Sequence, residues 1–198
     1  MPDSSSVPRN VPTITKAAIQ ALPLAQYRGP IHVIAPGQSC MAACRALADE
    51  EVIGFDTETR PAFRKGEHYL PALVQLATRH AVYLFQINRH WFPMEIVGIM
   101  ESAALIKSGL AVNQDLHKLK LIVAFREQNV IDLAVSAAQL GIKTTGLRSL
   151  AAMYLGARVS KRAQVTNWSR ATLTPAQIQY AATDAWISRE LYFKVFGK

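Results

Sequence analysis

Short apolar runs and longer segments with helical spacing follow one another along the chain. Runs of about four to eight apolar residues predict buried strands, whereas apolar positions three or four apart predict helices that face a core. The predicted strands lie at 31–34, 52–56, 72–77, 81–86 and 110–112, with a further strand near Val130. The predicted helices span 39–48, 93–102, 114–125, 133–140, 147–155 and 174–196.

Capping residues stand at the starts of several predicted helices. Ser39 and Asp132 are each expected to cap the helix that follows. The C-terminal helix has a clear start signal, since Thr174 can act as N-cap, Pro175 takes the first helical position and Gln177 completes a capping box. The start of this long helix is therefore placed at Thr174.

Strands dominate the first half of the chain and helices the second, with strand–helix alternation between them. This order predicts an α/β domain with a mixed β-sheet flanked by helices, in which 72–77 and 81–86 form an antiparallel pair. Residues 1–29 are rich in Ser and Pro and predict a flexible or loosely docked N-terminal arm. Residues 30–198 are expected to form a single domain, because 198 residues suffice for one core and are too few to favour two.

Composition and charge narrow the class of protein. Half of the residues are apolar and 18% are charged, which is typical of a globular domain rather than a disordered chain. The formal net charge is +8 and the sequence pI is about 9.7, an excess that suits a polyanionic partner, although many basic proteins bind none.

The positive charge is concentrated in one stretch. Between Asp132 and Asp184 there is no acidic residue, so the cations there are not offset. These cations are Lys143, Arg148, Arg158, Lys161, Arg162 and Arg170. The stretch predicts a surface that lies along nucleic-acid phosphates, with a solvated basic face as the alternative.

Cysteine content and the N-terminal sequence bear on location. Cys40 and Cys44 lie four apart in a predicted helix, no second Cys or His pair has zinc-ligand spacing, and both are interpreted as core residues in a reducing compartment. No apolar run reaches the length of a membrane span, and the first residues lack the apolar core of a signal peptide. A soluble cytoplasmic protein without a membrane partner is expected, with an organellar presequence as the alternative.

Carboxylates stand in apolar surroundings at the end of one predicted strand. Asp56 and Glu58 close this strand as GFDTET, and two residues apart on a strand they project from one face. Burying two such groups together is costly unless a cation lies between them. A strand that simply runs out into a polar loop is the alternative explanation.

Two further acids lie in predicted helices. Asp115 falls in the first turn of its helix, where the helix dipole alone would favour an acid. Tyr180 and Asp184, four apart, share a helical face that Ile187 and Leu191 continue, so this face points inward. An aspartate on a core-facing stripe breaks the binary pattern and indicates a function, unless it pairs with a core arginine.

Four carboxylates and one tyrosine can converge from these three elements in an α/β fold. Oxygen ligands without Cys or His favour Mg²⁺ or Mn²⁺ over zinc. A four-carboxylate site is what two-metal phosphodiester cleavage requires. The sequence therefore predicts a site for two divalent cations.

At these residues the chain resembles a known family. The order D-x-E, then D, then Y-x-x-x-D is similar to that of the DEDD 3′–5′ exonucleases, in the tyrosine-bearing subgroup that includes ribonuclease D, polymerase proofreading domains and the Werner-type exonuclease domain. Over about residues 50–196 the likeness to the Werner-type domain is the greatest, in the ordered segments GFDTETRPAFRKG, LVQLAT, AVYLFQI and TNWSRATLTPAQIQYAATDA. The resemblance implies a ribonuclease H-like fold and the removal of nucleotides from the 3′ end of nucleic acid.

The resemblance also implies a role for each residue of the predicted site. Asp56 would bridge two Mg²⁺ or Mn²⁺ ions, while Glu58 and Asp184 would hold the ion on the side of the nucleophile. Asp115 would hold the second ion, largely through water. Tyr180 would position the attacking water, and could deprotonate it only with the help of a nearby cation.

Several more residues are candidates for contact with the nucleic acid. Thr57 and Thr59 flank the acids and are expected near the terminal 3′-hydroxyl. Trp168 is a candidate for stacking on a base, with packing in the core as the alternative. The candidate phosphate contacts are Arg64, Lys65, Lys161, Arg162 and Arg170.

The sequence predicts the reaction more narrowly than the substrate, which could be DNA or RNA. Likeness to the Werner-type domain slightly favours DNA, and a ribonuclease D-like exoribonuclease is the alternative within the same chemistry. Two further candidates are a proofreading subunit that acts inside a polymerase complex and a binding module without activity. A binding module is expected to have lost at least one acid, whereas all four acids and the tyrosine are present.

Overall fold

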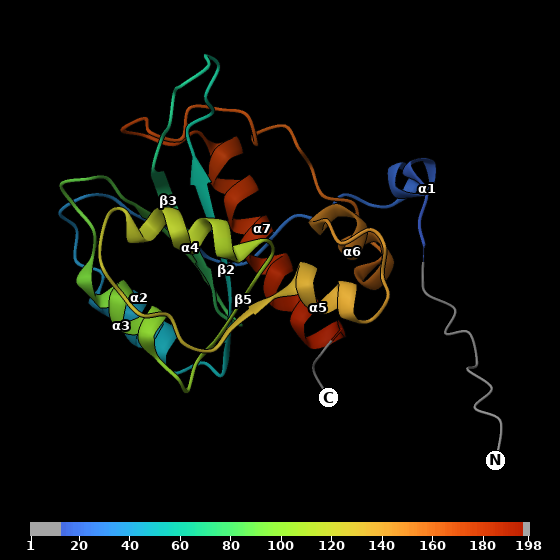
Figure 1. The fold of residues 1–198 in the computed structure, drawn as a ribbon, viewed down its shortest axis with the longest axis horizontal. Coiled ribbons are helices and arrows are strands. Elements are labelled where there is room, and N and C mark those ends of the chain that lie inside the picture. The colour runs from blue at the N-terminus through green and yellow to red at the C-terminus, as the bar shows by residue number, and fades with distance from the viewer. Residues whose placement is uncertain (1–12, 196–198) are drawn as a thin grey trace.

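The computed structural model describes residues 13–195, which form seven helices and a six-stranded sheet (Figure 1). The strands are β1 (Ile31–Ile34), β2 (Val52–Thr59), β3 (Pro71–Ala77), β4 (Val82–Gln86), β5 (Ile106–Gly109) and β6 (Val130–Asp132). The helices are α1 (Lys16–Ala21), α2 (Met41–Ala48), α3 (Met94–Glu101), α4 (Val112–Lys120), α5 (Leu133–Gln139), α6 (Leu147–Leu155) and α7 (Pro175–Val195). Within this part of the chain, no helix combines the length and the apolar composition that crossing a membrane requires.

The sheet is mixed, in the strand order β1-β4-β3-β2-β5-β6. Strands β2, β3 and β4 pair antiparallel, whereas β1 pairs parallel with β4, and β5 and β6 continue parallel from β2. The mixed α/β fold and the antiparallel pair formed by β3 and β4 are thus confirmed. Strand β2 runs three residues beyond the predicted end, so the acids lie within the sheet rather than after it.

Two layers of helices cover the two faces of the sheet (Figure 1). On one face, Ile53 and Phe55 of β2 pack with α2, α3 and α4. On the other face, small residues of α7 pack on β3 and β4, and α5 and α6 pack on the far side of α7. Because side chains of a strand alternate, Gly54, Asp56 and Glu58 all face α7. The acids therefore point into the layer that the longest helix occupies.

A glycine sets the distance between β2 and α7. A Cβ at Gly54 would lie 1.9 Å from the carbonyl oxygen of Ala185, so only a residue without a side chain fits. Gly54 shares a face with Asp56, and Ala185 follows Asp184 in the helix. This close approach of the two backbones brings the aspartates of strand and helix together.

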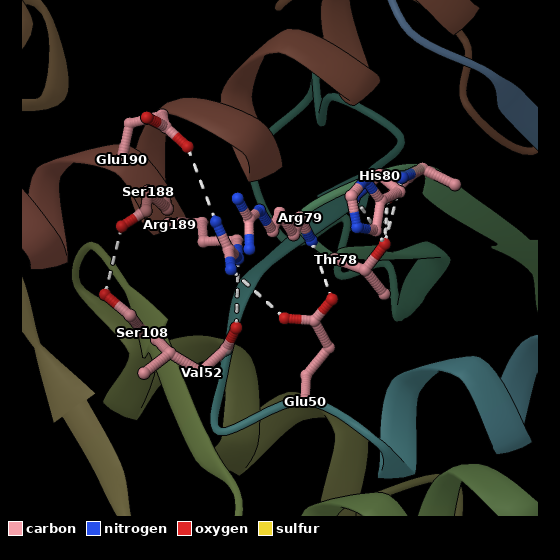
Figure 2. A network of polar contacts seen from close by, with 10 residues as sticks. Glu50, Val52, Thr78, Arg79, His80, Ser108, Ser188, Arg189 and Glu190 are labelled. Atoms are coloured by element: carbon pink, nitrogen blue, oxygen red, sulfur yellow. Dashed lines mark hydrogen bonds and ion pairs between the residues drawn. The ribbon is translucent and has the colours of Figure 1, made fainter.

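The C-terminal part of α7 is fixed to the start of β2 by a buried arginine. Arg189 donates from Nε to the carbonyl oxygen of Val52 at 3.0 Å and forms an ion pair with Glu50 at 3.1 Å (Figure 2). Glu190 lies 3.6 Å away on the same helix, and Ser108 of β5 donates to the carbonyl oxygen of Ser188. Helix α7 is thus held by backbone contact at Gly54 within β2, and by Arg189, which binds Val52 at the start of β2 and Glu50 just before it.

The prediction of a strand at 110–112 is wrong. The strand of this region is β5, and Ala111 has a left-handed backbone (φ 57°) just before α4 begins at Val112. The strand was hidden by Lys107, whose side chain is fully buried. Its Nζ donates to the carbonyl oxygens of Ser102 and Leu105, and burial lowers its pKa to about 8. A lysine whose ammonium group is bonded to backbone carbonyls just before it in the chain breaks the apolar pattern without breaking the strand.

The remaining predicted boundaries differ by smaller amounts. Helix α4 covers Val112–Lys120 instead of 114–125, and α2 has Cys40 rather than Ser39 at its N-cap, without a side-chain cap bond. The capping box of α7 is confirmed, because Gln177 donates from its backbone to Thr174 Oγ1 and the backbone of Thr174 donates back to Gln177 Oε1. Asp132 is confirmed as the cap of α5, where it accepts from Ala134.

Part of the predicted N-terminal arm has a defined place. Residues 13–29 contain helix α1 and an extended segment, and Ile19 and Tyr27 are buried. Leu24 forms a parallel bridge with Arg158, which fixes the segment against the chain between α6 and α7. Long-range contacts thus hold this part of the segment that was expected to be a flexible or loosely docked arm. Residues 1–12 lie outside the described residues.

Candidate active site

Three of the predicted carboxylates come together between β2 and α7. Asp56, Glu58 and Asp184 each offer an oxygen such that all three oxygens lie within 4.8 Å of one another. Glu58 and Asp184 are 9% and 5% exposed, so the cluster is largely shielded from water. The alternation of β2 and the contact at Gly54 account for this convergence, as the spacing in the sequence indicated.

The fourth acid reaches the cluster from the other face of the sheet. Asp115 lies in the first turn of α4, as predicted, and its carboxylate accepts a hydrogen bond from Thr57 Oγ1 at 2.7 Å. Thr57 alternates with Asp56 and Glu58 on β2 and so faces α4, where its hydroxyl links Asp115 to the strand of the other acids. Asp115 is not one of the three residues with mutually close oxygens, but its charge contributes to raising the pKa of both Asp56 and Glu58.

The electrostatics of the cluster reflect crowded, buried negative charge. Burial, followed by repulsion from Asp184 and Asp115, raises the pKa of Asp56 well above its ordinary value. Burial and then Asp56 raise the pKa of Glu58 to about 10. Burial also raises the pKa of Asp184 to about 7 and that of Asp115 to about 6. Without a cation, the site therefore holds protons at a pH where ordinary carboxyls are ionised.

The donor atoms fit divalent cations. Asp184 Oδ1 is buried and has no hydrogen-bond partner, and no described Lys or Arg forms an ion pair with Asp56, Glu58 or Asp184. Buried carboxylates without a partner are costly in a protein, whereas hard oxygen ligands are those that Mg²⁺ and Mn²⁺ prefer. The alternative of a salt bridge between Asp184 and a core arginine is wrong, because the arginine of α7 binds Glu50 instead.

Tyr180 lies one turn before Asp184 on the same face of α7. Both residues line a cavity of about 500 Å³ that also contains Asp56 and Glu58. Burial, then the carboxylates of Asp184 and Glu58, raise the pKa of the Tyr180 phenol above its ordinary value of about 10. The phenol is therefore protonated beside the acids and can orient a water molecule, but needs a nearby cation to act as a base.

The predicted phosphate contacts are divided among different places. Lys161 lines the cavity of the acids. Arg162 lines a neighbouring cavity of about 260 Å³, which shares Tyr180 and Asp184 with the first. Arg170 lines a separate cavity of about 400 Å³. Arg64 and Lys65 are exposed on the connection between β2 and β3, outside all three cavities.

Two of the predicted contacts are placed differently from expectation. Trp168 is fully buried, its ring lies 6.0 Å from that of Tyr180, and its Nε1 donates to the carbonyl oxygen of Gln164. A ring without an exposed face cannot stack on a base, so the alternative of core packing is correct. Thr59 is half-buried opposite Pro71 at the end of β2 and does not line the cavity of the acids.

Sequence patterns missed some residues of the cavity. Lys16 and Ile19 of α1 line it together with the acids. Arg148 of α6 also lines it, and the sequence counted it among the cations of the acid-free stretch without linking it to the acids. A signal for α1 was present, since Thr15 precedes a helical stretch and caps it by accepting from the backbone of Ala18. No local pattern could show that this helix lies beside the acids, because that contact joins residues far apart in the chain.

The chain that carries this carboxylate cluster and tyrosine matches a known protein family. The family model described as 3′–5′ exonuclease matches residues 31–195, which include all four acids and Tyr180. The chain belongs to this 3′–5′ exonuclease family. The match confirms the family predicted from the order of acids and tyrosine, and the mixed sheet between helical layers confirms the ribonuclease H-like fold.

Relatives of this exonuclease family include proteins of different length and name. The chain is 34% identical over 148 residues to a 3′–5′ exonuclease of Arabidopsis thaliana, covering 71% of this chain and 51% of that protein. It is 30% identical over 155 residues to the bifunctional 3′–5′ exonuclease/ATP-dependent helicase WRN of Mus musculus, covering 75% of this chain and 11% of that protein. The chain thus spans about half or less of the length of these relatives.

A solved structure shares the fold. The Trypanosoma brucei RNase D in complex with RNA U12 superposes with a TM-score of 0.76 at 17% identity, covering 86% of this chain and 64% of that one. At this identity the likeness concerns the fold alone. The order of strands and helices that positions the acids is therefore shared with an RNase D.

Proposed function

We propose that this exonuclease-family chain removes nucleotides from the 3′ end of nucleic acid by hydrolysis that depends on two divalent cations. The observation that carries the proposal is the convergence of Asp56, Glu58 and Asp184 in a buried cluster that forms no ion pair with a described Lys or Arg. Such a cluster is costly for a protein that only needs to fold, and it matches the ligand type of phosphodiester-cleaving metal sites.

The four acids divide the task of holding the cations. Asp56 would bridge two ions, with Glu58 and Asp184 completing one site. Asp115, oriented by Thr57, would hold the second ion through water. When bound, Mg²⁺ or Mn²⁺ polarises the scissile phosphate and stabilises the charge that develops on the leaving 3′-oxygen. Cation binding would release the protons that the metal-free cluster retains.

Tyr180 would hold the attacking water. Its phenol faces the acids in the same cavity, and the raised pKa keeps its proton in place. A protonated phenol both donates and accepts a hydrogen bond, which fixes the orientation of a water molecule next to the scissile phosphate. The buried ring of Trp168 packs against that of Tyr180 at 6.0 Å.

DNA is the favoured substrate, and RNA is the second candidate. The resemblance of the ordered motifs to the Werner-type exonuclease domain slightly favours DNA, whereas the fold shared with an RNase D in complex with RNA favours RNA. Discrimination between the two depends on contacts to the 2′-hydroxyl in the cavity. A role as a proofreading subunit would differ in one respect, because activity would then require a polymerase complex.

The proposal is tested by digestion of nucleic acids labelled at the 5′ end. Single-stranded DNA, duplex DNA with a recessed 3′ end and RNA are incubated in parallel with Mg²⁺, Mn²⁺ or EDTA. The expected result is a ladder of products shortened from the 3′ end, with release of mononucleotides and no cleavage in EDTA. The substrate that is shortened fastest identifies the preferred nucleic acid.

The matched control is Glu190→Gln, which changes an acid of α7 outside the cluster. This variant should digest as the wild type does, whereas Asp184→Asn should not. Metal-independent cleavage, or cleavage within the strand, would contradict the proposal. Digestion by the isolated chain would exclude an obligatory polymerase partner.

A further inference from the structure

The N-terminal segment of residues 13–29 forms part of the wall of the active-site cavity. It lies outside residues 31–195, which match the exonuclease family. Helix α1 of this segment contacts α6, and the two helices lie side by side in Figure 1. Lys16 and Ile19 of α1 line the same cavity as Asp56, Glu58 and Asp184. The cavity is therefore completed by residues that the family match does not include.

Hydrogen bonds hold residues 22–27 of this segment in place, and α1 precedes them. Arg158 donates from its backbone to Pro23 and from Nε to Leu22, and its carbonyl oxygen accepts from Ala25. Two bonds then join Tyr27 to α7, since its backbone N–H donates to Thr183 Oγ1 and its carbonyl oxygen accepts from Gln179 Nε2. These contacts flank Tyr180 and Asp184 on α7, so the segment is attached to the helix that carries the site.

Three cations line this cavity, each from a different part of the chain. Lys16 comes from α1, Arg148 from the first turn of α6, and Lys161 from the connection to α7. Arg148 Nε is buried and has no hydrogen-bond partner. Among the described residues, none of the three forms an ion pair, although carboxylates line the same cavity. Unpaired cations and unpaired acids thus share one cavity.

A cavity that holds both unpaired cations and unpaired carboxylates suits a nucleic-acid strand bound together with divalent ions. A strand of nucleic acid brings phosphates that need cations, while divalent ions bound to the acids bring the charge that the acids lack. The guanidinium of Arg148 suits a phosphate because it offers several N–H donors in a plane, and a lysine adds a point charge. A neutral or cationic small molecule would leave Lys16, Arg148 and Lys161 without partners.

We propose that Lys16 and Arg148, together with Lys161, bind the phosphates of the substrate strand next to the bond that is cleaved, so that the N-terminal segment is a substrate-binding wall. This inference rests on the proposed exonuclease function. It assigns to α1 and α6 a binding role that the acid motif does not include. The segment then contributes to affinity for the strand, while the acids and Tyr180 determine the rate of cleavage.

The test measures strand binding separately from cleavage. Binding of a fluorescein-labelled oligonucleotide is followed by anisotropy in Ca²⁺ over a series of salt concentrations, and KM and kcat are measured in Mg²⁺. Lys16→Glu and Arg148→Gln are each expected to weaken binding and raise KM by about tenfold. Each should lower the log–log salt slope by about 0.7 for a single strand, with kcat within about twofold of the wild type.

Matched variants separate a phosphate contact from a general effect of charge or folding. Lys16→Arg should bind as the wild type does. Arg45→Glu reverses an exposed cation on α2, at the other face of the sheet, and should leave the salt slope unchanged apart from weak screening effects. The melting temperature of each variant shows that the comparison is made on folded protein.

Two outcomes would overturn the inference while the proposed function stands. An active Lys16→Glu protein with unchanged binding and salt slope would show that Lys16 is only solvated. Tighter binding by Lys16→Glu would show that the segment obstructs the cavity. Failure of the proposed function is recognised differently, since the wild type would then cleave none of the labelled substrates.

Discussion

Helix α7 carries two buried charged residues that face β2, and the protein treats them in opposite ways. Asp184 and Arg189 lie five positions apart in the sequence. Arg189 is paired with Glu50 and bonded to the carbonyl oxygen of Val52, so its charge is fully used by the fold (Figure 2). Asp184 has a buried oxygen without a partner and lies beside two further acids. The same helix thus contains one charge that holds the structure together and one that opposes it.

The comparison shows how a buried charged residue that stabilises the fold can be distinguished from one that serves the active site. A paired buried charge loses stability when its partner is removed, because the remaining group is left unpaired. An unpaired buried acid in a cluster gains stability when it is removed, because repulsion and desolvation are relieved. Stability and activity should therefore respond in opposite directions at the two positions.

The largest expected effect is on catalysis at the carboxylate cluster of Asp56, Glu58 and Asp184. Asp56→Asn removes one carboxylate of the cluster, the one proposed to bridge the two ions, and should lower kcat by about 10³-fold or more, since metal stabilisation of the transition state is worth several kcal/mol. In metal-free buffer at pH 8 the variant should melt at a higher temperature than the wild type. Activity assays and thermal unfolding with EDTA check both expectations. Wild-type activity in Mg²⁺ would end the two-metal proposal.

The second effect concerns the tyrosine. Tyr180→Phe keeps the ring that packs on Trp168 but removes the hydroxyl, so kcat should fall by about 10²–10⁴-fold with KM and metal affinity nearly unchanged. Single-turnover kinetics with a metal titration on both proteins provide the measurement. A variant with full kcat would show that Tyr180 only packs the helix, and weakened metal binding would place the hydroxyl among the ligands.

The third effect is a loss of stability when the buried Arg189 is replaced. Arg189→Met leaves Glu50 without its partner and the Val52 carbonyl without its donor, and should lower the free energy of unfolding by about 3 kcal/mol. Denaturant unfolding measures the loss. Cleavage by the folded protein at low temperature should stay within about twofold of the wild type. If Glu50→Gln added to Arg189→Met restores no stability, the ion pair is not the cause.

The smallest effect is the pH dependence of the metal-free protein. Carboxyls with a raised pKa in the folded state favour folding below the unfolded pKa of about 4, and lose that contribution as pH rises through their folded values. These values are about 6 for Asp115 and about 7 for Asp184, so stability in EDTA should fall between pH 5 and 8 by at least about 1 kcal/mol. Urea unfolding measures the trend. Saturating Mn²⁺ should remove it, and a rise of stability with pH in EDTA would contradict the assignment.

The carboxylate cluster could be predicted from the sequence, because the patterns that indicate it are local. Asp184 interrupts an apolar stripe of α7, Asp56 and Glu58 alternate along one strand, and the capping box at Thr174 fixes where the helix starts. Each of these is a relation between residues at most four positions apart. The ordered set then led to the family that residues 31–195 match.

The features that the sequence concealed depend on contacts across the chain. Lys107 is an exception, because the carbonyl oxygens that make it compatible with a buried strand lie only two and five positions before it, although no sequence pattern marks them. Trp168 looked available for a base because its burial depends on β3, β4 and α7. The N-terminal segment has a composition typical of a loose arm, but its place is set by Arg158, Thr183 and Gln179. Patterns within one segment carry no information on such partners.

The contact of Gly54 with Ala185 has a consequence for how the site tolerates change. Between these two residues backbone meets backbone, so no rotamer and no packed side chain determines the separation of strand and helix there. Core residues elsewhere can exchange one apolar side chain for another while the aspartates keep their spacing. The geometry that cations require is thus built into the main chain, which lowers the reorganisation needed when they bind. Apolar substitutions in the surrounding core are therefore expected to leave the spacing of the aspartates, and hence cation binding, largely unchanged.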